Sequence, residues 1–312
     1  MSESRRSRAW AIAARVAVSV ALLWLVSRYV DVPAVLSRLS ELEPGWVALG
    51  LAVSVLQVGV LAWRWRYTAA RLGVDLPLRR ALGEYYLGIL INQLLPGGVA
   101  GDVTRAWRHT RTDVPAGPAV RAVILERASA QVVMTLTAVA SVLVLPWASS
   151  ALRVTAAVAA AVLFGLVLGR LARRAAPASA AGRLWADTRR ALLAWDALAA
   201  QLATALLVVA SYIVVFVVAA RALGVETPLA TILPLVAPVL MTMLIPVTVA
   251  GWGIREAAAA ALWGLAGLTP ADGAAISVTY GLLVLVSSAP GLVVLTRTVI
   301  AGRGRRARPP RA

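Results

Sequence analysis

Long apolar stretches, separated by short segments rich in arginine, make up most of the 312-residue chain. Six of these stretches are close in length to the roughly 20 residues that a helix needs to cross a bilayer. They cover residues 10–26, 45–63, 122–146, 152–168, 198–219 and 273–295. Two more, 81–100 and 228–268, are apolar but interrupted by Pro, Gly and polar residues, which favours broken, re-entrant helices over full crossings. The pattern predicts an all-α polytopic transmembrane helical bundle with about six full crossings and two broken re-entrant elements.

Two of these segments have a second interpretation. The stretch 10–26 follows several arginines, as the apolar core of a signal peptide would, but Arg15 interrupts it and no clear small-residue cleavage site follows. We therefore predict a retained helix. The stretch 228–268 is long enough for two half-helices or for two short crossings. Both arrangements return the chain to the same side of the membrane.

The composition excludes several classes of protein. Hydrophobic residues make up 60% of the chain and charged residues only 14%, about half the charged share of a soluble domain. Too few polar residues remain to cover an apolar core of this size, so a soluble globular enzyme and a disordered chain are both excluded. Cysteine is absent and His109 is the single histidine, which argues against disulfides, thiol nucleophiles and Cys- or His-rich metal sites. We expect no metal and no cofactor, and we place His109 in a loop.

All 31 basic residues are arginines, and the formal net charge is +17. A basic chain can indicate a nucleic-acid partner, but these arginines lie in short loops between apolar spans, which indicates membrane orientation and anionic lipid headgroups instead. With both broken elements entering and leaving on one side, 26 arginines fall on one side of the membrane and 5 on the other. The positive-inside rule then places both termini in the cytoplasm, with the protein in the cell membrane. Residues 1–300 form one membrane domain in this interpretation, followed by a disordered basic tail at 301–312.

An internal repeat relates the two halves of the chain, 1–150 and 151–300. Residues 94–101 align without a gap on residues 244–251, and Arg105 then aligns on Arg255. Each half contains three crossings and one broken element, and because three is odd the second half is predicted to be inverted. Inverted repeats with matching broken helices are typical of transporters that bind their substrate where the broken elements meet.

The broken elements supply the candidate binding residues. The residues that we expect to interrupt the helices are Pro96, Gly97, Gly98 and Gly101 in the first element and Pro246, Gly251 and Gly253 in the second. A helix that restarts after such a break presents unpaired backbone N–H groups, which attract anions, and a guanidinium can bind two phosphate oxygens at once. The candidate headgroup-binding residues are Arg105, Arg255, Asp102, Glu256, Glu126, Arg127 and Asn92.

Several of these residues also have purely structural interpretations. Asp102 could act as a helix cap, and Glu126 and Arg127 could neutralise each other at the start of their helix. Arg105 could be one more positive-inside residue, whereas Arg255 lies on the arginine-poor side and is harder to explain in this way. Asn92 faces either the loose backbone of its own hairpin or the cavity.

No catalytic motif is present in the sequence, so our main hypothesis is a lipid translocase without covalent chemistry. An anionic headgroup would enter between the two broken elements and be held in turn by Arg105 and Arg255. One alternative is a membrane transferase acting on a polyprenyl phosphate, which would need a divalent metal and acidic ligands among Asp102, Glu126 and Glu256. Another is a scaffold for a separate lipid-modifying transferase. The sequence predicts membrane lipids as partners, no nucleic acid and no particular oligomeric state.

The broken elements resemble the two signatures of the lysylphosphatidylglycerol synthase transmembrane-domain family, whose members are also called flippase-like proteins. Residues 95–102, Leu-Pro-Gly-Gly-Val-Ala-Gly-Asp, followed by Arg105, resemble the first signature, and residues 246–256, which end in Arg-Glu, resemble the second. Glu126-Arg127 resembles the acidic-basic pair of the family's intervening helix. The resemblance covers roughly residues 10–300.

This resemblance implies a multi-pass plasma-membrane protein that moves or handles a lipid with a charged headgroup. Bifunctional members of the family add a cytosolic domain that aminoacylates phosphatidylglycerol. The present sequence ends at Ala312, after the basic tail, so we expect that domain to be missing and no lysyl transfer to occur. An anionic phospholipid or a polyprenyl-phosphate-linked sugar then fits as well as an aminoacylated lipid.

Overall fold

The structure of the chain is a computed structural model. It describes residues 41–95, 98–111, 114–173, 179–245 and 248–306, together with scattered positions between 10 and 40. Much of the predicted first span, the breakers Pro96, Gly97 and Pro246, and residues 307–312 of the predicted tail therefore lie outside the described residues.

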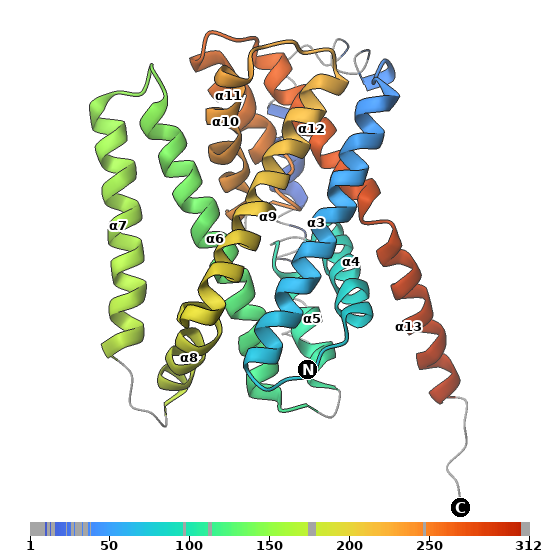
Figure 1. Cartoon of the computed structure of the whole chain (residues 1–312). Helices are drawn as coiled ribbons and strands as arrows, with labels where there is room; N and C mark the ends of the chain where they lie inside the picture. Colours follow the sequence, from blue (N-terminus) through green and yellow to red (C-terminus); the bar gives the residue numbers. More distant parts are fainter. Residues whose placement is uncertain are drawn as a thin grey trace, which may run out of the picture.

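Helices form every regular element of the described part of the chain (Figure 1). In chain order they are α3 (Pro44–Arg71), α4 (Leu78–Leu94), α5 (Ala100–Thr110), α6 (Ala116–Val144), α7 (Ser150–Arg173), α8 (Ala180–Thr188), a π-helical turn (Arg189–Leu193), α9 (Trp195–Ala222), α10 (Leu229–Met241), a 3₁₀ turn (Thr242–Leu244), α11 (Ile254–Leu265), α12 (Pro270–Ser287) and α13 (Pro290–Arg306). Among the described residues, α3, α6, α9 and α12 are long and apolar enough to cross a membrane. The chain is thus an all-α, multi-pass integral membrane protein, whereas the exact number of crossings stays a prediction.

The long helices α3 and α9 pack against each other and support a broken pair of helices on either side. One core cluster joins α3 to α4 and α6 around Trp65 and Tyr85. A second joins α9 to α10, α11 and α12, with Phe216 lying against Trp263 and Tyr280. The two broken pairs are therefore anchored to the same central helices but through separate clusters of large side chains.

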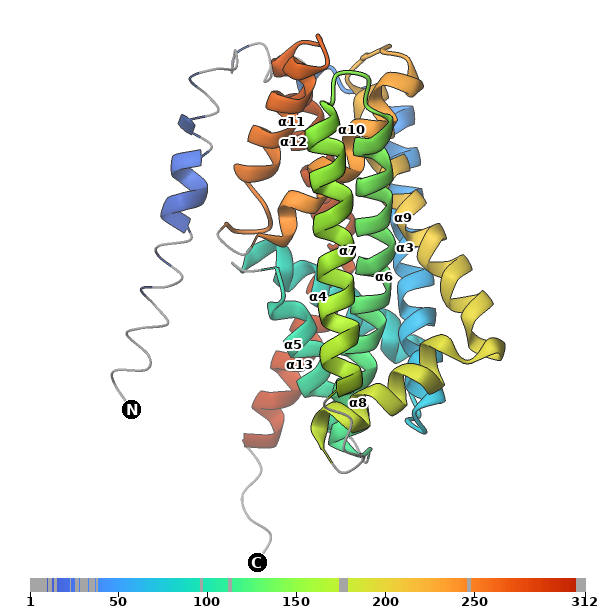
Figure 2. The ribbon, with the colours of Figure 1, turned by 90° about the vertical axis from the view of Figure 1, so that its left-hand side faces the viewer.

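The two broken elements lie at opposite ends of the bundle. Figures 1 and 2 show α4 and α5 in the lower half and α10 and α11 in the upper half, with their connecting loops near mid-height. The loops approach each other closely, since a Cβ atom built on Gly98 would lie 3.9 Å from the carbonyl oxygen of Met243. This arrangement is the one expected of two re-entrant hairpins. The inverted repeat itself stays a prediction, because the first span lies largely outside the described residues.

Positive φ angles mark the connecting loops. Gly98 has φ 63° in the first, and Ala250, Gly251 and Gly253 have φ 51°, 80° and 89° in the second. These glycines adopt a backbone conformation that other residues reach only at a cost, which fits their predicted role as helix breakers. Gly101, by contrast, lies inside α5, where its missing side chain lets α5 approach α4 at Gly88.

The helix boundaries correct the sequence prediction in four places. The predicted last span, 273–295, is two helices, because α12 ends at Ser287 and Pro290, which has no N–H to donate, begins α13. The segment 170–190 was expected to be a loop, but it contains the end of α7, α8 and a π-helical turn. Helix α6 starts at Ala116, so Glu126 and Arg127 lie inside the helix and not at its beginning. In addition, α13 continues to Arg306, into the segment predicted as a tail.

The close approach of α4 and α5 can be tested by Gly101→Ala. The added Cβ would lie 2.0 Å from the backbone oxygen of Gly88, and overpacking of this kind typically costs about 1–3 kcal/mol. We expect a lower thermal denaturation midpoint in detergent. The control is Gly59→Ala in α3, where the new Cβ meets no atom within 4 Å, and we expect that variant to be as stable as the unmodified protein or more so. Equal midpoints for both variants would contradict this packing.

Candidate functional site

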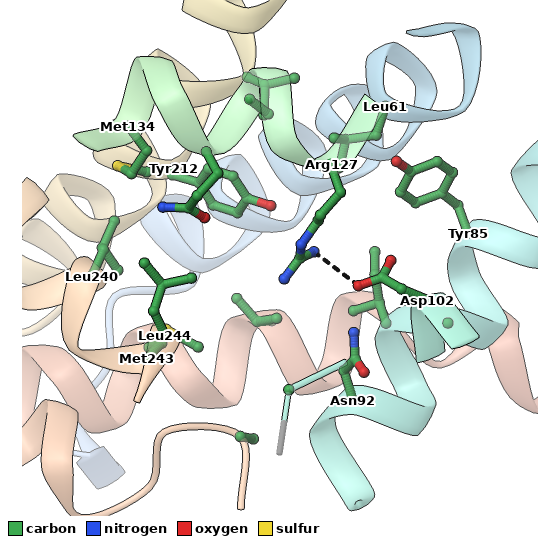
Figure 3. A pocket seen from close by; sticks show the side chains of 18 of the residues that line it. Leu61, Tyr85, Asn92, Asp102, Arg127, Met134, Tyr212, Leu240, Met243 and Leu244 are labelled. Atoms are coloured by element: carbon green, nitrogen blue, oxygen red, sulfur yellow. Dashed lines mark ion pairs between the residues drawn. The ribbon is translucent and has the colours of Figure 1, made fainter. Parts of the chain in front are cut away.

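A cavity of about 200 Å³ lies between the two hairpins. Its wall includes Asn92, Asp102 and Arg127 from the first half and Met243, Leu244 and Tyr280 from the second (Figure 3). Most of the remaining lining is apolar, with Met134 and Tyr212 closing the side formed by α6 and α9. The few polar groups are thus concentrated where α4, α5 and α6 meet.

Arg105 is the centre of a buried charge cluster beside this cavity. Only 1% of its side chain is exposed, and its Nη2 donates to Asp102 Oδ1 at 2.8 Å and to Glu126 Oε2 at 3.2 Å. The guanidinium also lies 3.9 Å from the centre of the Tyr85 ring and 4.7 Å from that of Trp65. Tyr85 in turn donates its hydroxyl to Glu126. Arg105 therefore ties α5 to α3, α4 and α6 through charge and aromatic contacts.

Arg127 follows Glu126 in the chain but lies in a different environment. Its side chain is 48% exposed and lines the cavity, and its Nη1 lies 3.4 Å from Asp102 Oδ2. Figure 3 shows the guanidinium extending into the middle of the cavity toward Asp102. Adjacent helical residues point about 100° apart, which is why one member of the pair is buried and the other is accessible.

The start of α5 is capped from within the hairpin. Asn92 Oδ1 accepts a hydrogen bond of 2.7 Å from the backbone N–H of Gly101, so this amide satisfies one of the donors left free where the helix restarts. Of the two roles considered for Asn92, the structure shows the backbone contact while also placing the residue in the cavity wall.

The second half contains a matching buried pair. Arg255 is 1% exposed, and its Nη2 donates to Glu256 Oε1 at 2.7 Å while its Nε donates to Ser277 Oγ at 2.8 Å. Glu256 Oε2 accepts a 2.6 Å hydrogen bond from the N–H of Gly253, the residue that precedes α11. The Arg255 guanidinium also lies over Trp252, at 5.1 Å, and Tyr280, at 5.3 Å. In both halves, then, an arginine on the half-helix after the break bonds to a side chain of the following helix, Glu126 or Ser277, and packs on a tyrosine.

The structure brings five of the seven candidate site residues to one cavity: Asn92, Asp102, Arg105, Glu126 and Arg127. Arg255 and Glu256 are buried beside it and are not among its lining residues. Sequence reasoning missed Tyr85, although it lies seven residues before Asn92 and hence on the same helical face. The placement of His109 in a loop was wrong, because this residue is buried in α5 with its ring 5.3 Å from that of Trp65.

Comparison with known families identifies the chain. The family profile described as "Lysylphosphatidylglycerol synthase TM region" matches residues 12–291. The chain belongs to this family. The match covers α3 to α12, so both hairpins, the cavity, Arg105 and Arg255 lie within the region that the lysylphosphatidylglycerol synthase TM family profile matches. A search among curated proteins found no match.

Arg105 and Arg255 should respond differently to the loss of one carboxylate. Within the described residues, Arg255 has one carboxylate partner, Glu256, whereas Arg105 has two. Removing the only partner of a buried charge typically costs about 3–5 kcal/mol. We therefore expect Glu256→Gln to lower the thermal denaturation midpoint clearly more than Asp102→Asn, which leaves the Arg105–Glu126 contact in place. An equal or larger loss in Asp102→Asn would contradict this assignment.

Proposed function

We propose that this protein binds and translocates a lipid with an anionic headgroup, which occupies the cavity between the two hairpins, and that it performs no covalent chemistry. Membership of the lysylphosphatidylglycerol synthase TM family supports a role in lipid metabolism or transport. The observation that carries the proposal is Arg127, whose half-exposed side chain lines a largely apolar cavity formed by both halves of the chain. A charged residue at membrane depth is costly and is retained mainly where it has a function.

Three arginines, Arg105, Arg255 and Arg127, are buried to different extents and therefore have different roles in this proposal. Arg105 and Arg255 are enclosed and held by carboxylates, so a headgroup could reach them only after their ion pairs opened. They position the half-helices α5 and α11. Arg127 has an accessible guanidinium and a single longer contact to Asp102, so it makes the first contact with the headgroup. The original hypothesis, in which Arg105 and Arg255 hold the headgroup in turn, requires both ion pairs to break during each cycle.

The dimensions of the cavity favour a headgroup over a whole lipid. About 200 Å³ is less than the 300–1,000 Å³ of a typical small-molecule site. The acyl or polyprenyl chains would therefore stay in the bilayer while the phosphate enters. Met134, Met241 and Met243 line the cavity, and such flexible, polarizable side chains adapt to different occupants.

Native mass spectrometry of the purified protein tests the proposal through Arg127→Ala. A hydrogen bond to a charged group contributes about 1.5–3 kcal/mol, so we expect retention of an anionic phospholipid to fall by roughly tenfold or more. Transport of a fluorescent anionic phospholipid in proteoliposomes should fall in parallel. Arg127→Lys keeps the positive charge but replaces the planar guanidinium, and it should give an intermediate loss of lipid retention and transport.

The matched control is Arg66→Ala, which removes an exposed arginine of α3 outside the cavity lining. We expect it to leave lipid retention and transport unchanged. Equal losses in both variants would show a general charge effect, and unchanged binding in Arg127→Ala would refute the proposed contact. Turnover of a polyprenyl phosphate that depends on a divalent metal would instead favour the transferase alternative. Co-purification of a soluble enzyme without bound lipid would favour the scaffold alternative.

A further inference from the structure

A second concave site lies at the arginine-rich end of the hairpin α4–α5, separate from the cavity. This groove has a volume of about 790 Å³ and runs between the start of α4, the end of α5 and α13. Its lining includes Arg79, Arg80, Arg108, Arg111 and Arg297 and one carboxylate, Glu84. It shares no lining residue with the cavity between the hairpins.

The positive charge in this groove is only partly compensated. Glu84 binds Arg108, with Nε and Oε2 2.7 Å apart. The remaining four guanidiniums make no ion pair with any carboxylate in the part of the chain that the structure describes. Like charges gathered in one concavity repel one another and produce a strong local field. An anion that enters the groove would relieve this repulsion.

Contacts within and between the walls hold three of these arginines, Arg80, Arg108 and Arg111, in place. Arg80 Nη2 donates to the backbone oxygen of Arg108 at 3.1 Å, and Arg111 packs 4.1 Å over the ring of Trp107. Arg108 Nη1 donates to Thr298 Oγ1 at 3.2 Å, which connects α5 to α13. A site whose donors are already positioned loses less conformational entropy when it binds a ligand.

We propose that this groove binds a phosphate group, that of an anionic phospholipid or of a soluble phosphate compound. The groove takes up the phosphate between Arg79 and Arg80 of α4 on one side and Arg297 of α13 on the other, with Arg111 at its edge. Planar guanidiniums match the geometry of phosphate oxygens, and basic pockets between helices at the cytoplasmic surface bind anionic lipid headgroups. The site goes beyond the proposed function, because it lies outside the cavity and does not involve Arg127.

The positive-inside rule alone would also place exposed arginines at this end of the molecule. The experiment must therefore distinguish a specific binding site from a generally basic surface. The test variant is Arg79→Ala/Arg297→Ala, which removes one guanidinium from each wall. The control is Arg66→Ala/Arg189→Ala, which removes the same charge from exposed positions of α3 and the π-helical turn outside the groove. Both pairs belong to segments that the sequence places on the same side of the membrane.

The purified full-length chain would be titrated with a short-chain phosphatidylglycerol in detergent, with binding followed by the rise in thermal denaturation midpoint and by native mass spectrometry. A second arm uses inorganic phosphate, and a third uses a short-chain phosphatidylcholine. One basic residue contributes about fivefold in affinity for an anionic membrane surface. We therefore expect the groove variant to bind phosphatidylglycerol roughly 30-fold more weakly, with little change in the control. If the groove variant weakens the binding of phosphatidylglycerol but not that of inorganic phosphate, the ligand is a lipid headgroup. If inorganic phosphate binds at similar concentrations and the groove variant weakens that binding too, the ligand is a soluble phosphate.

Equal weakening in the groove and control variants, or no specific binding in either of the anionic arms, would overturn the proposal. Its failure can be told from failure of the proposed function, because Arg127→Ala should leave this binding event intact. In native mass spectra, the two sites predict two separable lipids on the unmodified protein. The groove variant and Arg127→Ala should each lose a different one.

Discussion

The structure depends on buried ion pairs that two arginines, Arg105 and Arg255, make with carboxylates. Arg105 is enclosed with Asp102 and Glu126, and Arg255 with Glu256 and Ser277. An unpaired charge at such positions would cost several kcal/mol, so each arginine holds its half-helix against the helices that carry its partners. The breaks before α5 and α11 are thereby held at mid-height, where the two loops meet (Figure 2).

In this arrangement, the arginines that hold the half-helices in place differ from the arginine that is proposed to contact the ligand. Arg105 and Arg255 have carboxylate partners within the protein, and aromatic rings lie against both guanidiniums. Asp102 connects the two functions, since one of its oxygens faces Arg105 and the other faces Arg127 in the cavity. If an anion displaced Arg127, as the proposed function requires, the electrostatic environment of α5 would change directly through Asp102.

The sequence predicted the all-α class and the two broken elements, because Pro, Gly and charged residues leave strong signals in an apolar chain. Of the seven residues predicted to bind a headgroup, five line one cavity, whereas Arg255 and Glu256 do not. The sequence did not distinguish Glu126 from Arg127, because which face of α6 is buried depends on the packing of α3, α5, α9 and α10 around it. The division at Ser287–Pro290 was missed because the apolar run continues across it. His109 was misplaced because its burial depends on Trp65, which is 44 positions away in the chain.

The most direct test of this account is an experimental structure of the protein in a bilayer nanodisc that contains an anionic phospholipid. The account predicts density for a phosphate against the guanidinium of Arg127, with the Arg105–Glu126 and Arg255–Glu256 contacts intact. A phosphate bound to Arg105 or Arg255 with those pairs opened would contradict this difference in role between the arginines. A cavity that stays empty when the lipid is in excess would contradict the headgroup site itself.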